Sequence, residues 1–270
     1  MSRLTARFNE LSGDNRKALV AYIVAGDPTP GMTVELMHGM VEAGVDVIEL
    51  GVPFTDPEAE GPVIQAAHER ALQHSISLGD TLKMVSGFRE RDLTTPVVLM
   101  GYLNPVERMG YQSFAEAAGK LGVDGLITVN LPPEEAGALT VTLEENGVDP
   151  IYLLAPTTTE ARAAKICAAS RGFVYYVSLK GTTGAGGLDI DEVCLRVETL
   201  KAHTDLPLMV GFGIRDGATA APIAAVADGV VVGSAIVDLM RIHQQDPVAL
   251  KTSVMDCLAE IRLALNAPVA

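Results

Sequence analysis

The chain has 270 residues, and its 20 Lys and Arg against 34 Asp and Glu give a formal net charge of -14. This acidic balance repels phosphate backbones and anionic headgroups, which argues against nucleic acid or a membrane as partner. The hydrophobic content of 48% with no Trp predicts an aliphatic core, and the length suits one large domain of the α/β barrel kind.

Eight apolar, strand-like segments alternate with helical patterns along the chain. They lie at 18–25, 45–50, 96–100, 124–129, 150–154, 172–178, 206–211 and 228–233. Eight units of about 30 residues favour a closed parallel barrel over a doubly wound sheet, which usually has five to seven strands. We therefore predict an α/β fold, a single (β/α)8 TIM barrel over residues 1–270.

Two segments fall outside the eightfold repeat. Residues 2–12 carry Leu4, Phe8 and Leu11 at helical spacing, which predicts an extra N-terminal helix that plugs the N-terminal mouth of the barrel. The segment 62–91, after the second strand, is long enough for two helices. Further along, Thr157 and Glu160 have the spacing of a capping box and predict the start of a helix.

The second predicted strand ends in a glutamate. Side chains alternate along a strand, so Glu49 shares a face with Val45 and Val47 and points at the barrel axis if they do. An unpaired carboxylate buried there would cost several kcal/mol, so Glu49 is either paired with a Lys or Arg or kept for chemistry. The eight predicted strands contain no Lys or Arg.

Glycine turns follow the last two predicted strands. Gly211 and Gly213 follow the seventh, and Gly233 with Ser234 follows the eighth. Barrels often bind phosphate there with backbone N–H groups, although tight turns that only close the barrel are the alternative. The glycine-rich segment 181–187, after the sixth strand, is either a lid over a ligand or an ordinary surface loop.

Six residues near strand ends line an apolar slot or belong to the core: Tyr22, Met100, Ile127, Tyr175, Phe212 and Val232. A slot beside a phosphate site and a carboxylate suggests a phosphorylated substrate with a flat hydrophobic end. Lys180 follows the sixth strand, where Schiff-base aldolases on barrels carry their lysine, but we expect a surface lysine.

Cysteines and histidines are scattered without metal-ligand spacing, so we predict no metal site. The cysteines are expected to be small core residues, and the histidines to be structural or solvent-facing. These residues are Cys167, Cys194, Cys257, His38, His68, His74, His203 and His243. No apolar run of about 18 residues occurs and the first residues lack the apolar core of a signal peptide, so we expect a cytoplasmic protein.

Seven motifs carry a resemblance to a known family. They are ELGVPFTDP at 49–57, MGYLNP at 100–105, DGLITVNLPPEE at 124–135, LLAPTTT at 153–159, FVYYVSLKGTTGAG at 173–186, VGFGI at 210–214 and ADGVVVGSAIV at 227–237. In this order they resemble the tryptophan synthase alpha subunit over nearly the whole chain. The resemblance implies a lyase of tryptophan biosynthesis, which cleaves indole-3-glycerol phosphate to indole and glyceraldehyde 3-phosphate by a retro-aldol reaction, without metal or organic cofactor.

The resemblance also implies roles for individual residues. Glu49 matches the catalytic acid and base, and Glu60 matches the second carboxylate, which helps to remove the indole N–H proton. The six slot residues would hold the indole, and Thr183 in the lid would close onto position 60. The phosphate would lie on Gly184, Gly213, Gly233 and Ser234.

A partner is implied as well. The resemblance predicts a beta subunit that carries pyridoxal phosphate, joined to this chain in an alpha2-beta2 heterotetramer. Pro53, Asp56 and Asn104 would lie at the surface that faces this subunit.

The sequence departs from the family around the second carboxylate. The family pattern DPLADGP or DPMADGP reads DPEAEGP at 56–62, so Glu60 is one methylene longer and Glu58 replaces an apolar residue. Asn130 and Thr182 also replace the family's usual residues. Three functions remain open: an active lyase, a weakly active or inactive subunit that docks on and activates the beta subunit, and a Schiff-base aldolase that uses Lys180.

Overall fold

The structure is a computed structural model that describes residues 2–178, 190–211 and 213–267. In these residues, parallel strands form one sheet in the order β5-β4-β3-β2-β1-β9-β8-β7-β6. The strands are β1 (Ala18–Val24), β2 (Val47–Gly51), β3 (Val97–Gly101), β4 (Gly125–Thr128), β5 (Asp149–Ile151), β6 (Leu153–Leu154), β7 (Val174–Val177), β8 (Leu208–Gly211) and β9 (Gly229–Val232).

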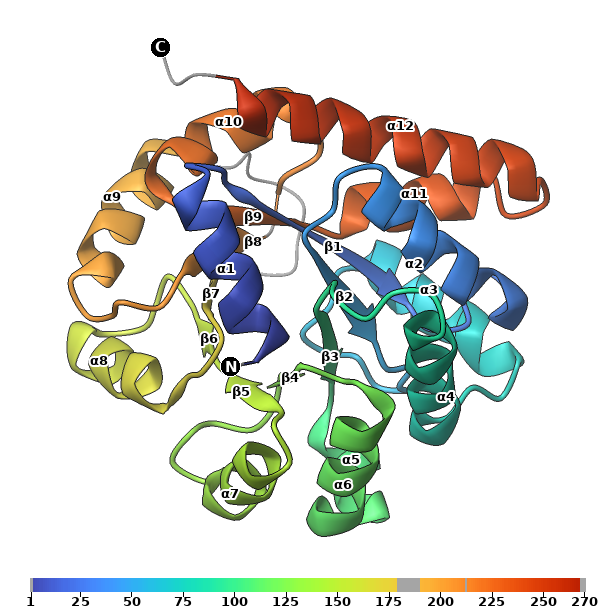
Figure 1. Ribbon diagram of the computed structural model, residues 1–270, viewed down its shortest axis with the longest axis horizontal. Coiled ribbons are helices and arrows are strands. Elements are labelled where there is room, and N and C mark those ends of the chain that lie inside the picture. The colour runs from blue at the N-terminus through green and yellow to red at the C-terminus, as the bar shows by residue number, and fades with distance from the viewer. Residues whose placement is uncertain (1, 179–189, 212, 268–270) are drawn as a thin grey trace.

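The fifth predicted strand is divided into β5 and β6, which flank Tyr152. β5 pairs with β4, β6 pairs with β7, and the Tyr152 carbonyl accepts a hydrogen bond of 3.4 Å from the Tyr175 N–H. The sheet therefore curves round into a nearly closed ring (Figure 1). This arrangement confirms the predicted (β/α)8 barrel, with its fifth strand interrupted at one residue.

Helices surround the barrel (Figure 1). They are α1 (Arg3–Gly13), the short 3-10 helix η1 (Pro30–Met32), α2 (Thr33–Glu42), α3 (Pro62–Gln73), α4 (Leu78–Arg89), α5 (Leu103–Met109), α6 (Tyr111–Leu121), α7 (Gly137–Glu145), α8 (Glu160–Ala169), α9 (Ile190–Lys201), α10 (Gly217–Val226), α11 (Ser234–Ile242) and α12 (Pro247–Asn266). Within the described part of the chain, none of them combines the length and the apolar character needed to cross a membrane.

The predicted helix pair after the second strand is confirmed by α3 and α4. Helix pairs also follow β3 and β9, as α5 with α6 and α11 with α12, which the eightfold reading did not predict. The predicted capping box at Thr157 is wrong. The N-cap of α8 is Thr159, whose side chain accepts from the Arg162 N–H.

The N-terminal helix α1 closes one end of the barrel, as predicted. Leu4, Phe8 and Leu11 are buried in the cluster that fills the barrel interior together with Val20 and Val47. Phe8 meets the ring of Phe173 edge to face, with ring centroids 5.8 Å apart. In Figure 1, α1 accordingly lies across the front of the ring of strands.

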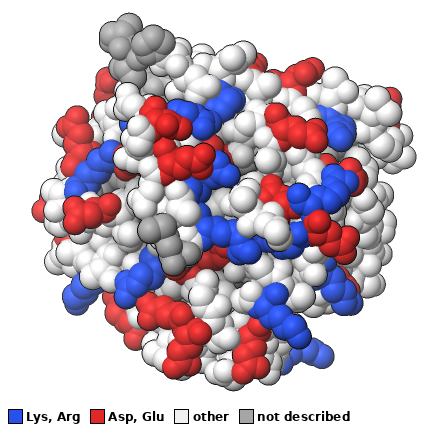
Figure 2. All heavy atoms as spheres, viewed as in Figure 1, with Lys and Arg blue, Asp and Glu red and all other residues white. Residues whose placement is uncertain are grey.

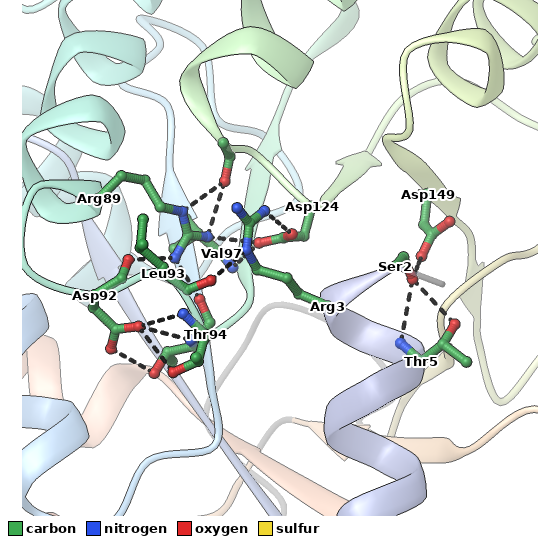
Figure 3. A network of polar contacts seen from close by, with 12 residues as sticks. Ser2, Arg3, Thr5, Arg89, Asp92, Leu93, Thr94, Val97, Asp124 and Asp149 are labelled. Carbon is green, nitrogen blue, oxygen red and sulfur yellow. Dashed lines mark hydrogen bonds and ion pairs between the residues drawn. The ribbon is translucent and has the colours of Figure 1, made fainter.

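One ion pair of Arg3 and one hydrogen bond of the N-cap Ser2 fasten α1 to the N-terminal ends of the strands (Figure 3). Asp124, before β4, accepts hydrogen bonds of 2.6 Å from Arg89 Nη2, 2.9 Å from Arg3 Nη1 and 2.8 Å from the Val97 N–H. The Ser2 hydroxyl donates to Asp149 Oδ2 at 2.9 Å. These contacts stabilise the packing of α1 on the N-terminal end of the barrel.

The same face mixes both signs of charge. Figure 2 shows Lys and Arg interspersed with Asp and Glu across it, although the chain as a whole is strongly acidic.

A second buried carboxylate, Asp46, is held in the same way as Asp124. It accepts hydrogen bonds of 2.8 Å from Arg262 Nη1 and 2.9 Å from the Leu19 N–H. Since active sites of such barrels form at the opposite, C-terminal ends of the strands, that end remains for chemistry.

Candidate active site

Glu49 lies on the inner face of β2, two residues after Val47. Val47 packs in that cluster, whereas Ile48 and Leu50 pack in the outer cluster beneath the helices, so alternation points Glu49 inward. The predicted common face does not extend to Val45. This residue precedes β2, which begins at Val47, and packs in the outer cluster. The side chain of Glu49 is 1% exposed, and its Oε2 has no hydrogen-bond partner among the described residues.

A second carboxylate, Glu60, is buried near Glu49. Burial raises the pKa of Glu49 to about 8, with a further contribution from the charge of Glu60. Burial also raises the pKa of Glu60 to about 7. None of the ion pairs in the described part of the chain involves either carboxylate. The salt-bridge alternative for Glu49 therefore has no support among the described residues, and both carboxyl groups have pKa values near neutral pH.

The loop between β2 and α3 carries Glu60 and is held at several points. The Phe54 ring stacks on the ring of Tyr102, with centroids 4.9 Å apart, and the Tyr102 hydroxyl accepts from the Ala59 N–H at 3.1 Å. Gln65 Nε2 donates to the Glu60 carbonyl at 2.8 Å. These contacts hold the loop at Phe54, at the Ala59 nitrogen and at the Glu60 carbonyl, so the backbone that carries the Glu60 side chain is anchored.

Two tyrosines on the strands flank the carboxylates. A Cβ added to Gly51 would lie 2.3 Å from the Tyr22 hydroxyl oxygen, and one added to Gly211 would lie 2.2 Å from that of Tyr175. The rings therefore rest on bare backbone at the C-terminal ends of β2 and β8. The pKa of each tyrosine is raised, first by burial and then by the charges of both carboxylates. The two hydroxyls and the two carboxylates thus share one buried region.

Other predicted slot residues lie close by. Met100 packs against both the interior cluster and the cluster around Tyr22, and Ile127 is buried in the interior cluster with Tyr175. Val232 does not join them. It packs in the outer cluster, and its neighbour Val231 takes the inner face of β9.

Comparisons with known proteins agree over the whole chain. The family model described as tryptophan synthase alpha chain matches residues 8–263. The chain belongs to the tryptophan synthase alpha chain family. It is 60% identical to the tryptophan synthase alpha chain of Thioalkalivibrio sulfidiphilus over 98% of this chain and 100% of that one, and 56% identical to that of Methylococcus capsulatus over 99% and 100%. A crystal structure of tryptophan synthase subunit alpha from Legionella pneumophila superposes with a TM-score of 0.91 at 44% identity, covering 98% of this chain and 99% of that one.

The phosphate residues expected of an alpha chain lie in two places. Gly213 has a φ of 81°, in the left-handed region that favours glycine. Gly233 is the N-cap of α11 and Ser234 is its first residue. Free backbone N–H groups and the positive end of the helix dipole therefore lie at these two residues, where an anion can bind. A Cβ on Gly233 would lie 3.4 Å from the Tyr22 Cβ, which sets this helix end beside the slot.

Several expected residues lie outside the described part of the chain: Thr182, Thr183, Gly184, Phe212 and Lys180. The lid and the Schiff-base alternative for this alpha chain depend on them. Among the described residues, no group of three or more His, Cys, Asp or Glu side chains is arranged to hold a metal ion.

The residues expected to face a beta subunit differ in exposure. Asp56 and Asn104 are exposed, whereas Pro53 is buried. Asn130, one of the departures from the alpha chain family, accepts from the Leu103 N–H at 2.8 Å and donates to Asn104 Oδ1 at 3.5 Å. It therefore braces the first turn of α5, in which Asn104 lies.

Two further residues of the site were missed in the sequence. Tyr102 holds the loop of Glu60, and His68 lies behind Tyr22 with 2% of its surface exposed. His68 shares the buried face of α3 with Ile64, Ala67 and Ala71. That helical spacing is visible in the sequence and could have marked His68 as a buried histidine of this alpha chain.

Proposed function

We propose that Glu49 and Glu60 carry out the proton transfers by which this lyase cleaves indole-3-glycerol phosphate to indole and glyceraldehyde 3-phosphate. The observation that carries the proposal is the pair itself: two buried carboxyl groups at the C-terminal end of the barrel, with pKa values of about 8 and about 7. Near neutral pH one carboxyl holds a proton while the other is ionised. An acid and a base are therefore available at the same time.

The retro-aldol reaction uses this pair in two steps. First, protonated Glu49 donates its proton to C3 of the indole ring, while ionised Glu60 accepts the proton of the indole N–H. Next, the Glu49 carboxylate takes the proton of the hydroxyl on the carbon attached to C3. That hydroxyl becomes the aldehyde, the electrons of the broken C–C bond restore the indole ring, and Glu60 returns the proton to nitrogen. Both carboxyl groups end as they began.

Substrate binding is assigned to the groups around the pair. The apolar slot of Tyr22, Met100, Ile127 and Tyr175 is suited to a flat indole ring. The N-terminus of α11, with Gly233 and Ser234, would bind the phosphate. This arrangement explains how a chain with a net charge of -14 binds an anion, since backbone N–H groups supply the positive field.

The wider assembly is also part of the proposal. The family implies a beta subunit as partner, and we propose an alpha2-beta2 heterotetramer in the cytoplasm. The beta subunit would use pyridoxal phosphate to consume the indole, and this chain would need neither metal nor organic cofactor. The exposed side chains of Asp56, in the loop after β2, and Asn104, in the first turn of α5 after β3, would face that subunit.

Indole release tests the proposal. The parent chain and Glu49→Gln are assayed with indole-3-glycerol phosphate, each with and without a tryptophan synthase beta chain. The amide fills the space of the carboxyl group but cannot exchange the proton, so we expect release to fall by at least about 10²-fold while substrate still binds. Activity of Glu49→Gln within about tenfold of the parent would overturn the role of Glu49.

A further inference from the structure

His68 connects the loop of Glu60 to the strand of Tyr22. It lies on α3, which packs alongside β1, and its ring is almost fully buried. Nδ1 lies 3.0 Å from the Phe54 backbone nitrogen, and Nε2 lies 3.3 Å from the Tyr22 hydroxyl oxygen. Each ring nitrogen therefore meets a different part of the site.

These contacts determine where the proton of the imidazole lies. A backbone N–H can only donate, so Nδ1 must accept from Phe54 and carries no proton. Burial lowers the pKa of His68 to about 4, so the ring is neutral at physiological pH. Its proton is thus on Nε2, which donates to the Tyr22 hydroxyl.

The direction of the Tyr22 hydroxyl follows. Because its oxygen accepts from His68, its own proton remains free to be donated elsewhere. Tyr22 pairs with Glu49 across β1 and β2, and its hydroxyl rests over Gly51, the next inward position of β2 after Glu49. The hydroxyl proton is therefore available on the side where the carboxylates and the substrate meet.

We propose that His68 is a positioning residue, which holds the Tyr22 hydroxyl as a hydrogen-bond donor toward the reacting part of the substrate. The inference rests on the proposed function, because it takes the region around Glu49 and Glu60 as the place of cleavage. The contact to Phe54 fixes the tautomer and ties the same histidine to the loop that carries Glu60. His68 itself touches no substrate in this account, and it acts through Tyr22.

Two substitutions separate the ring nitrogens. The side-chain oxygen of Asn is as many bonds from Cβ as Nδ1 of His, so His68→Asn retains the acceptor for Phe54 but loses the donor to Tyr22. The side-chain nitrogen of Gln corresponds to Nε2, so His68→Gln retains the donor to Tyr22. Each is made alone and together with Tyr22→Phe, which removes the hydroxyl. His38→Asn is the control, because His38 is a buried histidine that packs on Phe88 in the outer layer.

Indole release is measured for all of these chains. We expect His68→Asn to lower kcat about tenfold with KM changed less than about threefold, and His68→Gln to retain kcat within about threefold. In the Tyr22→Phe background, His68→Asn should have no further effect, because the hydroxyl it orients is absent. His38→Asn should lower only the midpoint of thermal unfolding.

The histidine ring nitrogens of the free parent chain give a readout that does not depend on activity. Nitrogen-15 NMR should show His68 neutral at pH 7 with its proton on Nε2. A proton on Nδ1, or a kcat loss for His68→Asn that is equal with and without Tyr22→Phe, would overturn the inference alone. If His68→Asn does not fold, a loss of more than about tenfold in His68→Gln would do the same. A parent chain that releases no indole would instead overturn the proposed function, and this inference with it.

Discussion

Replacing Glu49 by Gln should remove a pH-dependent loss of stability from the folded chain. The pKa of Glu49 is raised from 4.5 to about 8, chiefly by burial. Because the folded pKa exceeds the unfolded one, the folded chain binds more protons than the unfolded chain between these values, and the free energy of unfolding falls as pH rises. The contribution is fully present below about pH 4.5 and lost by about pH 8.

The size of the effect follows from the shift. At pH 7, about 2.5 units above the unfolded pKa and still below the folded one, the folded state holds a proton that the unfolded state has released. At about 1.36 kcal/mol per unit, this difference is on the order of 3 kcal/mol. Glutamine does not titrate, so Glu49→Gln should gain on the order of 3 kcal/mol over the parent between pH 4 and pH 7.

Urea unfolding at several pH values between 4 and 8 measures this difference. The buried amide has its own cost, which is the same at every pH, so the slope and not the absolute value is the test. Glu58→Gln is the matched control, because Glu58 is exposed on the same loop, and its difference from the parent should stay flat. If the difference between Glu49→Gln and the parent is also flat, Glu49 is ionised in the folded chain and its pKa is not raised by burial.

Three other changes have distinct expected outcomes. Glu60→Asp should raise kcat for indole release with little change in KM, because on an unchanged backbone the glutamate side chain reaches too far by one bond of about 1.5 Å. A fall in kcat with saturating beta chain would mean that the loop is adapted to glutamate. Gly211→Ala places a Cβ 2.2 Å from the Tyr175 hydroxyl, so the ring must move by about 1 Å and kcat/KM should fall on the order of 10²-fold. An unchanged kcat/KM would mean that Tyr175 does not line the substrate site. Arg89→Ala leaves Asp124 buried without its closest partner and should lower the free energy of unfolding in urea by about 3–5 kcal/mol. Because this pair lies at the opposite end of the barrel from Glu49, kcat should stay within about twofold at a temperature where the chain is folded.

The barrel and the buried glutamate at the C-terminal end of β2 could be predicted because both depend on local alternation. Val47 and Glu49 share the inner face of β2, and the absence of Lys and Arg from the predicted strands left Glu49 without a neutralising partner. Burial of the pair then follows from the fold.

Other features depend on contacts between distant segments. The threonines of 157–159 all suit an N-cap, but Thr158 accepts from the Ala155 N–H, which leaves Thr159 to cap α8. Tyr152 lies at the break in the fifth strand, and its hydroxyl shares a 2.8 Å hydrogen bond with Thr140 on α7. No sequence pattern encodes such competition.

His68 shows the same limit at the site. Its partners, Phe54 and Tyr22, come from a loop and a strand that are 14 and 46 residues away in sequence. The helical spacing of α3 reveals that His68 is buried, but the fold alone brings it to the Tyr22 hydroxyl. Scattered histidines therefore gave no functional signal.

If the buried pair of Glu49 and Glu60 works as acid and base, the pH dependence of kcat/KM for indole release should show it, because kcat/KM reports the groups of the free enzyme. We predict an alkaline limb near pH 8, where Glu49 loses the proton that it donates to C3. Ionisation of the substrate phosphate, near pH 6, does not affect this limb. A kcat/KM that stays constant or keeps rising from pH 7 to pH 9.5, with the chain folded throughout, would mean that Glu49 is not the proton donor.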